Sequence, residues 1–155
     1  MAKIIYGERI GKLGVISVGC SATNFNPSRR KVLLTRRADN DLWCLPGGAM
    51  DPGESVTEAC AREVWEGTGL QVRVGKLIGV YSDPHQLVEY ADSNRFQIVA
   101  LNFKAEPIGG SLRITEETTD AVYFSLAEID AIDLMEHHRE RIVDAFMGQV
   151  TMFVS

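Results

Sequence analysis

Alternating apolar and polar positions predict the strands of this chain. Residues 14–22 have a period of two, and one mostly apolar face is made by Ile16, Val18, Cys20 and Ala22. A turn containing Pro27 separates this segment from a short apolar run at residues 31–36. We therefore expect the two segments to pair as a β-hairpin.

Further strands are expected in the second half of the chain. Residues 71–81 are rich in β-branched and aliphatic side chains, and residues 95–104 are apolar on both alternating faces. Such two-sided apolar character is typical of a central strand that is buried on both sides. A loop at residues 107–110 would lead to a short edge strand at residues 111–114, and residues 121–124 would form a later strand.

Residues 56–68 are predicted to form a helix because both of its ends carry clear signals. Ser55 with Glu58 three residues later is a capping-box pattern, and Gly69 suits the left-handed conformation that ends many helices. The apolar stripe, which we expect to pack on a sheet, consists of Val56, Cys60 and Val64.

Two more helices are expected near the C-terminus. One is short, at residues 126–132, and the other is an amphipathic helix at residues 136–147 with Ile142, Ala145 and Phe146 on one stripe. Strands and helices that alternate in this way indicate an α/β fold in which helices cover a mixed sheet.

Composition narrows the class of protein. The 155 residues are 45% hydrophobic and 24% charged, as in an ordinary globular protein, so we expect a single domain over residues 1–155. A net charge of −5 argues against a nucleic-acid-binding surface, which needs basic side chains. The three cysteines show no metal-ligand spacing, and no signal or membrane-spanning segment is evident. We therefore expect a cytoplasmic protein without a membrane partner.

Regularly spaced carboxylates distinguish residues 48–70 from the rest of the chain. On a helix, Glu63 and Glu66 lie about 60° apart, so their carboxylates converge on one face. Mg²⁺ prefers oxygen ligands of this kind. A solvated helix face is the better explanation for any single glutamate here, and only the whole pattern favours a metal site.

Residues 48–70 resemble the Nudix box, GX5EX7REUXEEXGU, in which U is an aliphatic residue. The matching positions are Gly48, Glu54, Arg62, Glu63, Val64, Glu66, Gly69 and Leu70, whereas Gly67 replaces the second glutamate of the EE pair. The resemblance implies the Nudix fold, a curved mixed β-sheet sandwiched between α-helices. It also implies a pyrophosphohydrolase, and a homodimer as in many relatives.

The resemblance also implies roles for the residues of the box. Glu63 and Glu66 would bind Mg²⁺, for which Mn²⁺ is a possible substitute, with the Gly48 carbonyl and Glu54 as additional ligands. Arg62 would support catalysis by orienting the glutamates through ion pairs. The metal would neutralise phosphate oxygens and activate the attacking water.

Gly67 removes one carboxylate from this set, which leaves three outcomes open. The protein could bind fewer metals, use an acid from elsewhere, or bind its ligand without catalysis. Members of the family often place a carboxylate on a loop before a late strand, as a metal ligand or general base. Glu117 is the first choice for that position and Glu116 the second, with Asp120 also on the loop. A solvated loop charge is an equally good explanation for each.

Side chains for substrate binding are expected outside the helix. Arg36 and Arg37 end a strand beside the box, where a guanidinium could reach a phosphate. Trp43, Tyr81 and Phe96 could stack on a nucleobase, although aromatic residues more often pack in a core.

His137 and His138 are adjacent on the last predicted helix, so they cannot share one helical face. A solvent-exposed role is therefore favoured over a catalytic one.

The substrate class follows only in part from the sequence. ADP-ribose hydrolases of the family tend to carry a proline about fifteen residues beyond the box, and Pro84 is near that position. ADP-ribose or a nucleotide sugar is therefore favoured, with nucleoside triphosphates next. Two alternatives from other classes stay open, a nucleotide-sensing domain with a degenerate box and an isomerase of a diphosphate metabolite.

Overall fold

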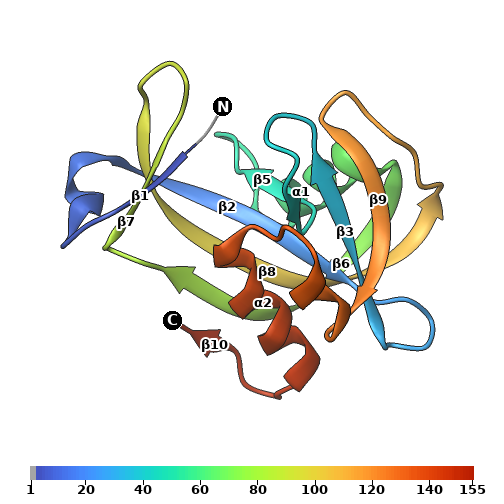
Figure 1. Cartoon of the computed structure of the whole chain (residues 1–155). Coiled ribbons are helices and arrows are strands. Elements are labelled where there is room, and N and C mark those ends of the chain that lie inside the picture. Colours follow the sequence, from blue (N-terminus) through green and yellow to red (C-terminus); the bar gives the residue numbers. More distant parts are fainter. Residues whose placement is uncertain (1–2) are drawn as a thin grey trace.

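The computed structural model describes residues 3–155, so residues 1 and 2 of the expected domain lie outside the described range. Within that range, two β-sheets and two α-helices pack together (Figure 1). The larger sheet contains β1 (Lys3–Tyr6), β2 (Val15–Asn24), β5 (Gly47–Ala49), β6 (Leu70–Ser82), β7 (Gln86–Glu89), β8 (Arg95–Gly110) and β10 (Phe153–Val154). The smaller sheet contains β3 (Lys31–Arg37), β4 (Trp43–Cys44) and β9 (Thr118–Ser125). The helices are α1 (Val56–Thr68) and α2 (Glu136–Met147), with 3₁₀ turns at Ile10–Leu13 and Glu128–Ala131.

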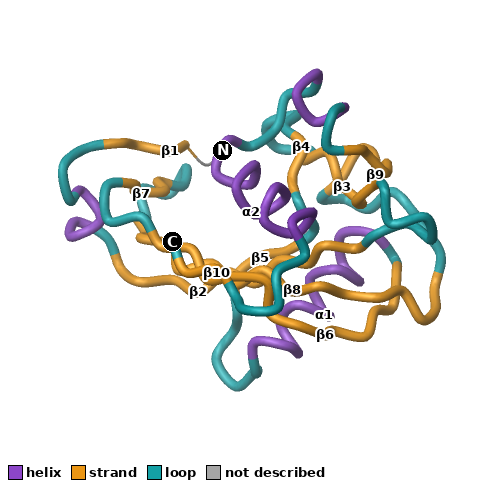
Figure 2. Tube along the Cα trace, turned by 90° about the horizontal axis from the view of Figure 1, so that it is seen from below, coloured by secondary structure: helices purple, strands orange, loops and turns teal. Residues whose placement is uncertain are grey.

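Strand β8 is the centre of the larger sheet. It pairs in parallel with β2 and antiparallel with β6 and β7, so the sheet is mixed. Helix α1 packs against β2, β5 and β6, and α2 lies on the other side of the larger sheet, as Figures 1 and 2 show. The expected α/β fold, with a mixed sheet between helices, is confirmed.

The predicted β-hairpin of residues 14–22 and 31–36 does not form. Strand β2 pairs with β5 and β8, whereas β3 pairs with β4 and β9 in the other sheet. Only an isolated bridge between Phe25 and Val32 connects the two segments. A strand has two edges, and other partners occupy both edges of each strand: β5 and β8 flank β2, and β4 and the distant β9 flank β3.

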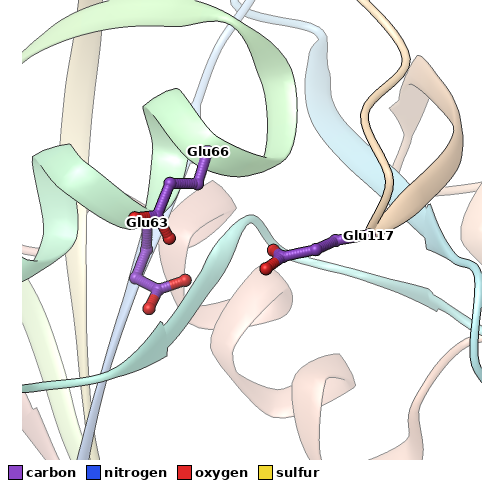
Figure 3. Close-up of side chains that lie close together, drawn as sticks. All are labelled: Glu63, Glu66 and Glu117. Atoms are coloured by element: carbon purple, nitrogen blue, oxygen red, sulfur yellow. The ribbon is translucent and has the colours of Figure 1, made fainter.

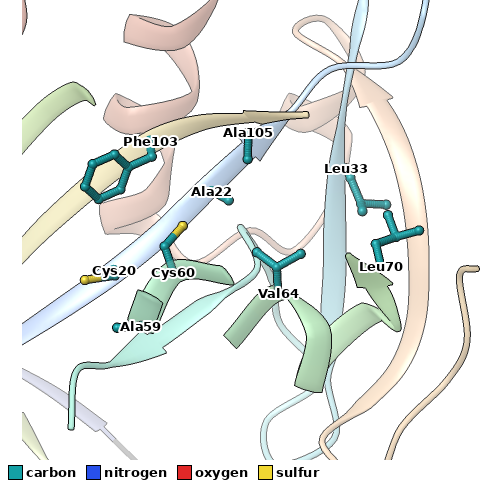
Figure 4. Packing of buried hydrophobic residues seen from close by; sticks show 9 residues of the cluster. All are labelled: Cys20, Ala22, Leu33, Ala59, Cys60, Val64, Leu70, Phe103 and Ala105. Carbon is teal, nitrogen blue, oxygen red and sulfur yellow. The ribbon is translucent and has the colours of Figure 1, made fainter. Parts of the chain in front are cut away.

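Helix α1 begins and ends where its sequence signals predict. The Ser55 hydroxyl accepts the Glu58 N–H, and the Glu58 carboxylate accepts the Ser55 N–H, which completes the capping box. Gly69 has a φ of 78°, which a residue with a Cβ adopts only under strain. Cys60 and Val64 of the predicted stripe are buried, and Val56 is half-buried against the same core. This core has side chains of both sheets (Figure 4): Cys20, Ala22, Leu33, Ala59, Cys60, Val64, Leu70, Phe103 and Ala105.

A second core lies under α2. It contains Val32 and Leu34 from β3, together with Leu45, Ile129 and Ile142. Because successive side chains of a strand point to opposite faces, β3 contributes Leu33 to the first core and its neighbours to the second. Strand β3 is thereby packed against a hydrophobic core on each of its two faces.

Other boundaries differ from the sequence prediction. Residues 107–110, expected as a loop, are the end of β8 and pair with the start of β6. Residues 111–114, expected as an edge strand, are not in a strand, and the helix expected at residues 126–132 is the 3₁₀ turn Glu128–Ala131. Residues 96–99 of the central strand are half-buried rather than buried on both sides. None of the helices in residues 3–155 has the length and apolar character needed to cross a bilayer.

Candidate active site

Three carboxylates meet at the C-terminal half of α1. Glu63 and Glu66 come from the helix, and Glu117 comes from the loop that precedes β9 (Figure 3). Each offers an oxygen, and these oxygens all lie within 4.8 Å of one another. Three hard oxygen donors at this separation fit a divalent cation such as Mg²⁺. The structure thus brings a residue of the expected acidic loop to the glutamates of the helix.

Arg62 holds the carboxylates of the box in place. Its guanidinium donates to both oxygens of Glu54, at 2.6 and 2.8 Å, and to the carbonyl of Ala49 at 3.1 Å. It also donates to one oxygen of Glu63 at 2.9 Å and to one of Glu66 at 3.2 Å. Since a carboxylate has two oxygens, Glu63 and Glu66 each keep one free for a metal. This arrangement fits the expected orienting role of Arg62.

Glu54 and Glu63 differ in what surrounds their carboxylates. The hydrogen bonds from Arg62 and from the Asp51 N–H lower the pKa of Glu54 to about 2. Burial raises the pKa of Glu63, and repulsion from Glu66 and Glu117 adds to this against the opposing effect of Arg62. Arg62 thus occupies both oxygens of Glu54. The ionised form of Glu63 is disfavoured by burial and by the neighbouring carboxylates, so a bound cation would stabilise it most.

Gly48 lies directly against Glu63. A Cβ at position 48 would collide with the Glu63 carboxylate, so only glycine permits this close approach. The Gly48 backbone is thus beside the carboxylate cluster, where its carbonyl was expected to serve as a metal ligand.

Gly67, the departure from the box, faces the same site. It is buried and lines a cavity of about 380 Å³ together with Glu63, Glu116 and Glu117. A Cβ at position 67 would meet only Thr118 Cγ2, at 4.0 Å. Packing therefore leaves space for a side chain here, and the missing carboxylate is not excluded by the fold.

The remaining loop acids and the two arginines are placed unequally. Glu116 lines the acidic pocket but is not part of the three-carboxylate cluster, and the Asp120 carboxylate accepts the N–H of the next residue. Arg37 lines the pocket and forms a paired ion bridge with Asp39, with both N–O distances at 2.9 Å. Arg36 is exposed, and its Nε donates to a loop carbonyl. Of the two arginines, only Arg37 lines the acidic pocket.

The aromatic residues expected to stack on a base serve packing instead. Trp43 packs edge-to-face on Phe124, with ring centroids 4.9 Å apart, beside the second core. The hydroxyl of Tyr81 donates to Asp144 at 2.8 Å, and Phe96 contacts another aromatic ring. Trp43 is the first residue of β4. Because β4 and β9 both pair with β3, Trp43 comes close to β9, and the local sequence gives no sign of this pairing.

A second cavity of about 620 Å³ adjoins the acidic pocket. It lies between the larger sheet and α2, and it shares with the acidic pocket Arg37, Cys44, Gly47, Gly48 and Tyr90. Its α2 side carries His137, His138 and Arg141. A substrate that spans both cavities would pass the carboxylate cluster.

The prediction that both histidines face solvent is wrong. His138 is buried, and its Nδ1 accepts the Leu45 N–H at 3.0 Å, while His137 lines the cavity beside it. Burial lowers the pKa of His137 to about 4, so the ring is neutral at pH 7. Helix α2 forms one wall of the cavity. His137 and His138 therefore both line it, although their side chains are about 100° apart around the helix axis.

Sequence reasoning also missed Arg141. The positions of His138, Arg141, Ile142 and Ala145 follow the i, i+3, i+4, i+7 spacing of a buried helix face, and all four are buried. His138 and Arg141, two polar residues on an otherwise apolar face, were the sequence signal that this face borders a polar site.

Comparison with known proteins agrees with this geometry. The family described as NUDIX domain matches residues 16–146. The chain belongs to the NUDIX family. Its fold class and its type of enzyme, a pyrophosphohydrolase, are those implied by the resemblance of residues 48–70.

Several relatives and solved structures resemble this Nudix protein. A MutT-like protein of Streptomyces ambofaciens is 39% identical over 113 residues, which are 68% of this chain and 67% of the relative. An ADP-ribose pyrophosphatase of Methanocaldococcus jannaschii is 33% identical over 76% of this chain and 66% of the relative. The match thus spans about two thirds of each relative. A UDP-X diphosphatase structure has a TM-score of 0.74 at 22% identity, over 92% of this chain and 68% of that one, and shows the shared fold.

Proposed function

We propose that this Nudix enzyme hydrolyses the pyrophosphate bond of a nucleoside diphosphate linked to a further moiety, with Mg²⁺ as the metal. The observation that carries the proposal is the set of Glu63, Glu66 and Glu117 oxygens within 4.8 Å of one another. Carboxylates so close repel one another unless a cation lies between them. Bound there, Mg²⁺ would neutralise the phosphate oxygens and lower the pKa of the attacking water.

Five residues have distinct roles in the proposed reaction. Glu63 and Glu66 would hold the metal through their free oxygens, while Arg62 fixes the orientation of both carboxylates. Arg37 lines the acidic pocket and would contact a phosphate of the substrate. Glu117 lies on a loop and has no bond to Arg62, so its carboxylate is the group available to accept the proton of the attacking water.

The two adjoining cavities support a substrate with groups on both sides of the pyrophosphate. A cavity of about 620 Å³ is in the size range of small-molecule sites, and it is separate from the acidic pocket in which the reaction would occur. We therefore favour ADP-ribose or a nucleotide sugar. The names of the relatives, ADP-ribose pyrophosphatase among them, agree with this choice. Nucleoside triphosphates are second, since a Bacillus subtilis relative is a putative 8-oxo-dGTP diphosphatase.

Product formation from a substrate panel tests the proposal. The panel contains ADP-ribose, UDP-glucose, dGTP and 8-oxo-dGTP, each with Mg²⁺ and with Mn²⁺, and the nucleoside monophosphate product is detected by chromatography. We expect metal-dependent cleavage that is lost in Glu63→Gln. Absence of cleavage for all four compounds by folded protein, with tight binding retained, would favour the nucleotide-sensing alternative. A rearranged diphosphate without cleavage would favour the isomerase.

A further inference from the structure

Arg141 is a buried cation that forms no ion pair with any residue in the described range 3–155. Only 6% of its surface is exposed, and its Nε has no hydrogen-bond acceptor. The residue lies on α2 in the wall of the 620 Å³ cavity. Arginine stays charged in proteins, so a charge is held here away from water.

The surroundings of Arg141 do not neutralise it. Burial lowers its pKa to about 10, and this effect outweighs the opposing influence of Tyr81, Cys44 and Glu140. The two neighbouring histidines are held neutral, first by burial and then by the positive charge of Arg141 itself. An unpaired buried charge costs stability, so a site of this kind calls for an anion from outside the chain.

The other polar groups of the cavity point to the same ligand. Arg37 lies at the boundary with the acidic pocket, and the Nδ1 atom of His137 is buried without a partner. His138 uses its Nδ1 as an acceptor, so its Nε2 carries the proton and can donate. Of the described residues that line the cavity, Glu136 is the one carboxylate, and it is exposed. The basic side chains of this wall are Lys3, Arg37 and Arg141, and among the described residues Lys3 pairs with Glu89 and Arg37 with Asp39, whereas Arg141 has no ion-pair partner.

We propose that Arg141 anchors an anionic group of the substrate, a carboxylate or a phosphate monoester carried in addition to the pyrophosphate. The inference rests on the proposed function, because it assigns one end of that substrate to this cavity. A planar guanidinium can bind either anion through two parallel hydrogen bonds. Arg141 would then determine which linked compounds the enzyme prefers, while the carboxylate cluster performs the reaction.

A structural role for Arg141 makes the opposite prediction for stability. Its guanidinium carbon lies 5.9 Å from the centroid of the Tyr81 ring, so the residue could instead support packing by a cation–π contact. If packing were its function, Arg141→Met would lower the melting temperature. If it is an unpaired anchor, removal of the buried charge leaves the melting temperature unchanged or raises it.

Binding to matched ligand pairs tests the proposal. UDP-glucuronate and UDP-glucose differ by one carboxylate, and 2′-phospho-ADP-ribose and ADP-ribose differ by one phosphate monoester. Calorimetric titration in EDTA prevents metal-dependent turnover. We expect the wild-type protein to bind the anionic member of at least one pair about tenfold more tightly, as one charge-assisted contact would give. The pair that shows the preference identifies the anion.

Variants of one helix provide the control. Arg141→Met should reduce the preference to less than about twofold, and Arg141→Lys, which keeps the charge without the planar fork, should give an intermediate value. Arg139→Met removes an exposed arginine of the same helix that pairs with Asp130, and it should leave the preference unchanged. Equal affinity for both members of both pairs in the wild type, or an unchanged preference in Arg141→Met, would refute the proposal.

Hydrolysis separates this inference from the proposed function. If ADP-ribose is cleaved with Mg²⁺ and no pair shows an anion preference, the inference fails and the proposed function stands. If the preference is present and depends on Arg141 while no compound is cleaved, the proposed function fails and the cavity remains an anion-binding site.

Discussion

The two adjoining cavities of this Nudix protein have opposite charge. The smaller one is lined by Glu63, Glu116 and Glu117, and the larger one by Arg141 and two neutral histidines. A cation would balance the charge of the first, and an anion would balance the charge of the second. The contrast indicates that the groups for bond cleavage and the groups for substrate choice are separate, and that they meet at the glycines of β5.

The two sites also differ in how their residues are held. Beside the acidic pocket, Arg62 donates hydrogen bonds to Glu54, Glu63 and Glu66, so two of the three carboxylates of the cluster have a defined geometry in the protein itself. In the larger cavity, Arg141 has no such network, and its hydrogen bonds would be completed by the ligand. Loss of a residue should therefore affect rate on one side and preference on the other.

The largest expected effect comes from the carboxylates of α1. Glu63→Gln and Glu66→Gln should each lower kcat by at least about tenfold, equivalent to roughly 1.4 kcal/mol of transition-state stabilisation. The reason is the loss of a charged metal ligand. Steady-state kinetics with ADP-ribose and Mg²⁺ measure the change, with the exposed Glu106→Gln as control. The comparison of the two cavities would be wrong if Glu63→Gln also removed the anion preference measured in EDTA.

A smaller effect is expected at the acidic loop. Glu117→Gln should lower kcat by roughly three- to tenfold, because one oxygen donor of the cluster and the proposed proton acceptor are lost. Glu116→Gln is the matched control, since Glu116 lines the pocket outside the cluster, and it should change kcat by less than about twofold. Equal losses in the two variants would mean that the loop acts through its total charge, and a larger loss in Glu116→Gln would exchange their roles.

A gain is expected at the position where the box departs from its pattern. Gly67→Glu adds a carboxylate beside the three of the cluster, and about 1 kcal/mol of helix propensity is recovered with it. We expect the Mg²⁺ concentration at half-maximal rate to fall by about two- to fivefold. Gly67→Gln has the same size without the charge and should not show this shift. An identical result for both variants would show that helix stability, rather than metal binding, limits the enzyme.

The smallest effect concerns stability at low pH. The pKa of Glu54 is lowered from 4.5 to about 2 in the folded protein, so its ionised form stabilises the fold above pH 4.5. This contribution is lost as the pH falls from 4.5 through 2. Urea unfolding at pH 7 and pH 3 should show a smaller pH-dependent loss for Glu54→Gln than for the wild type. Glu140→Gln, on α2, is the control, and an equal loss in all three proteins would contradict the Arg62 pairing.

Local signals predicted α1 well because they act within one turn of the chain. The capping box at Ser55, the glycine end at Gly69 and the convergence of Glu63 and Glu66 depend only on helical geometry. The hairpin prediction failed because strand pairing depends on partners far away in sequence. The adjacent segments 14–22 and 31–36 found other partners in two different sheets.

The sequence by itself determined the family, the bounds of α1 and the convergence of Glu63 and Glu66 on one face of that helix. Only the tertiary structure decided that Glu117, and not Asp120, joins that helix, since the pairing of β9 with β3 sets the path of the loop. The tertiary structure also decided that Trp43 packs against Phe124 and that His138 and Arg141 line a cavity. The physical reason is that the spacing of residues along a helix fixes the direction of each side chain relative to the helix axis. Which group that side chain contacts depends on how elements distant in sequence pack against the helix.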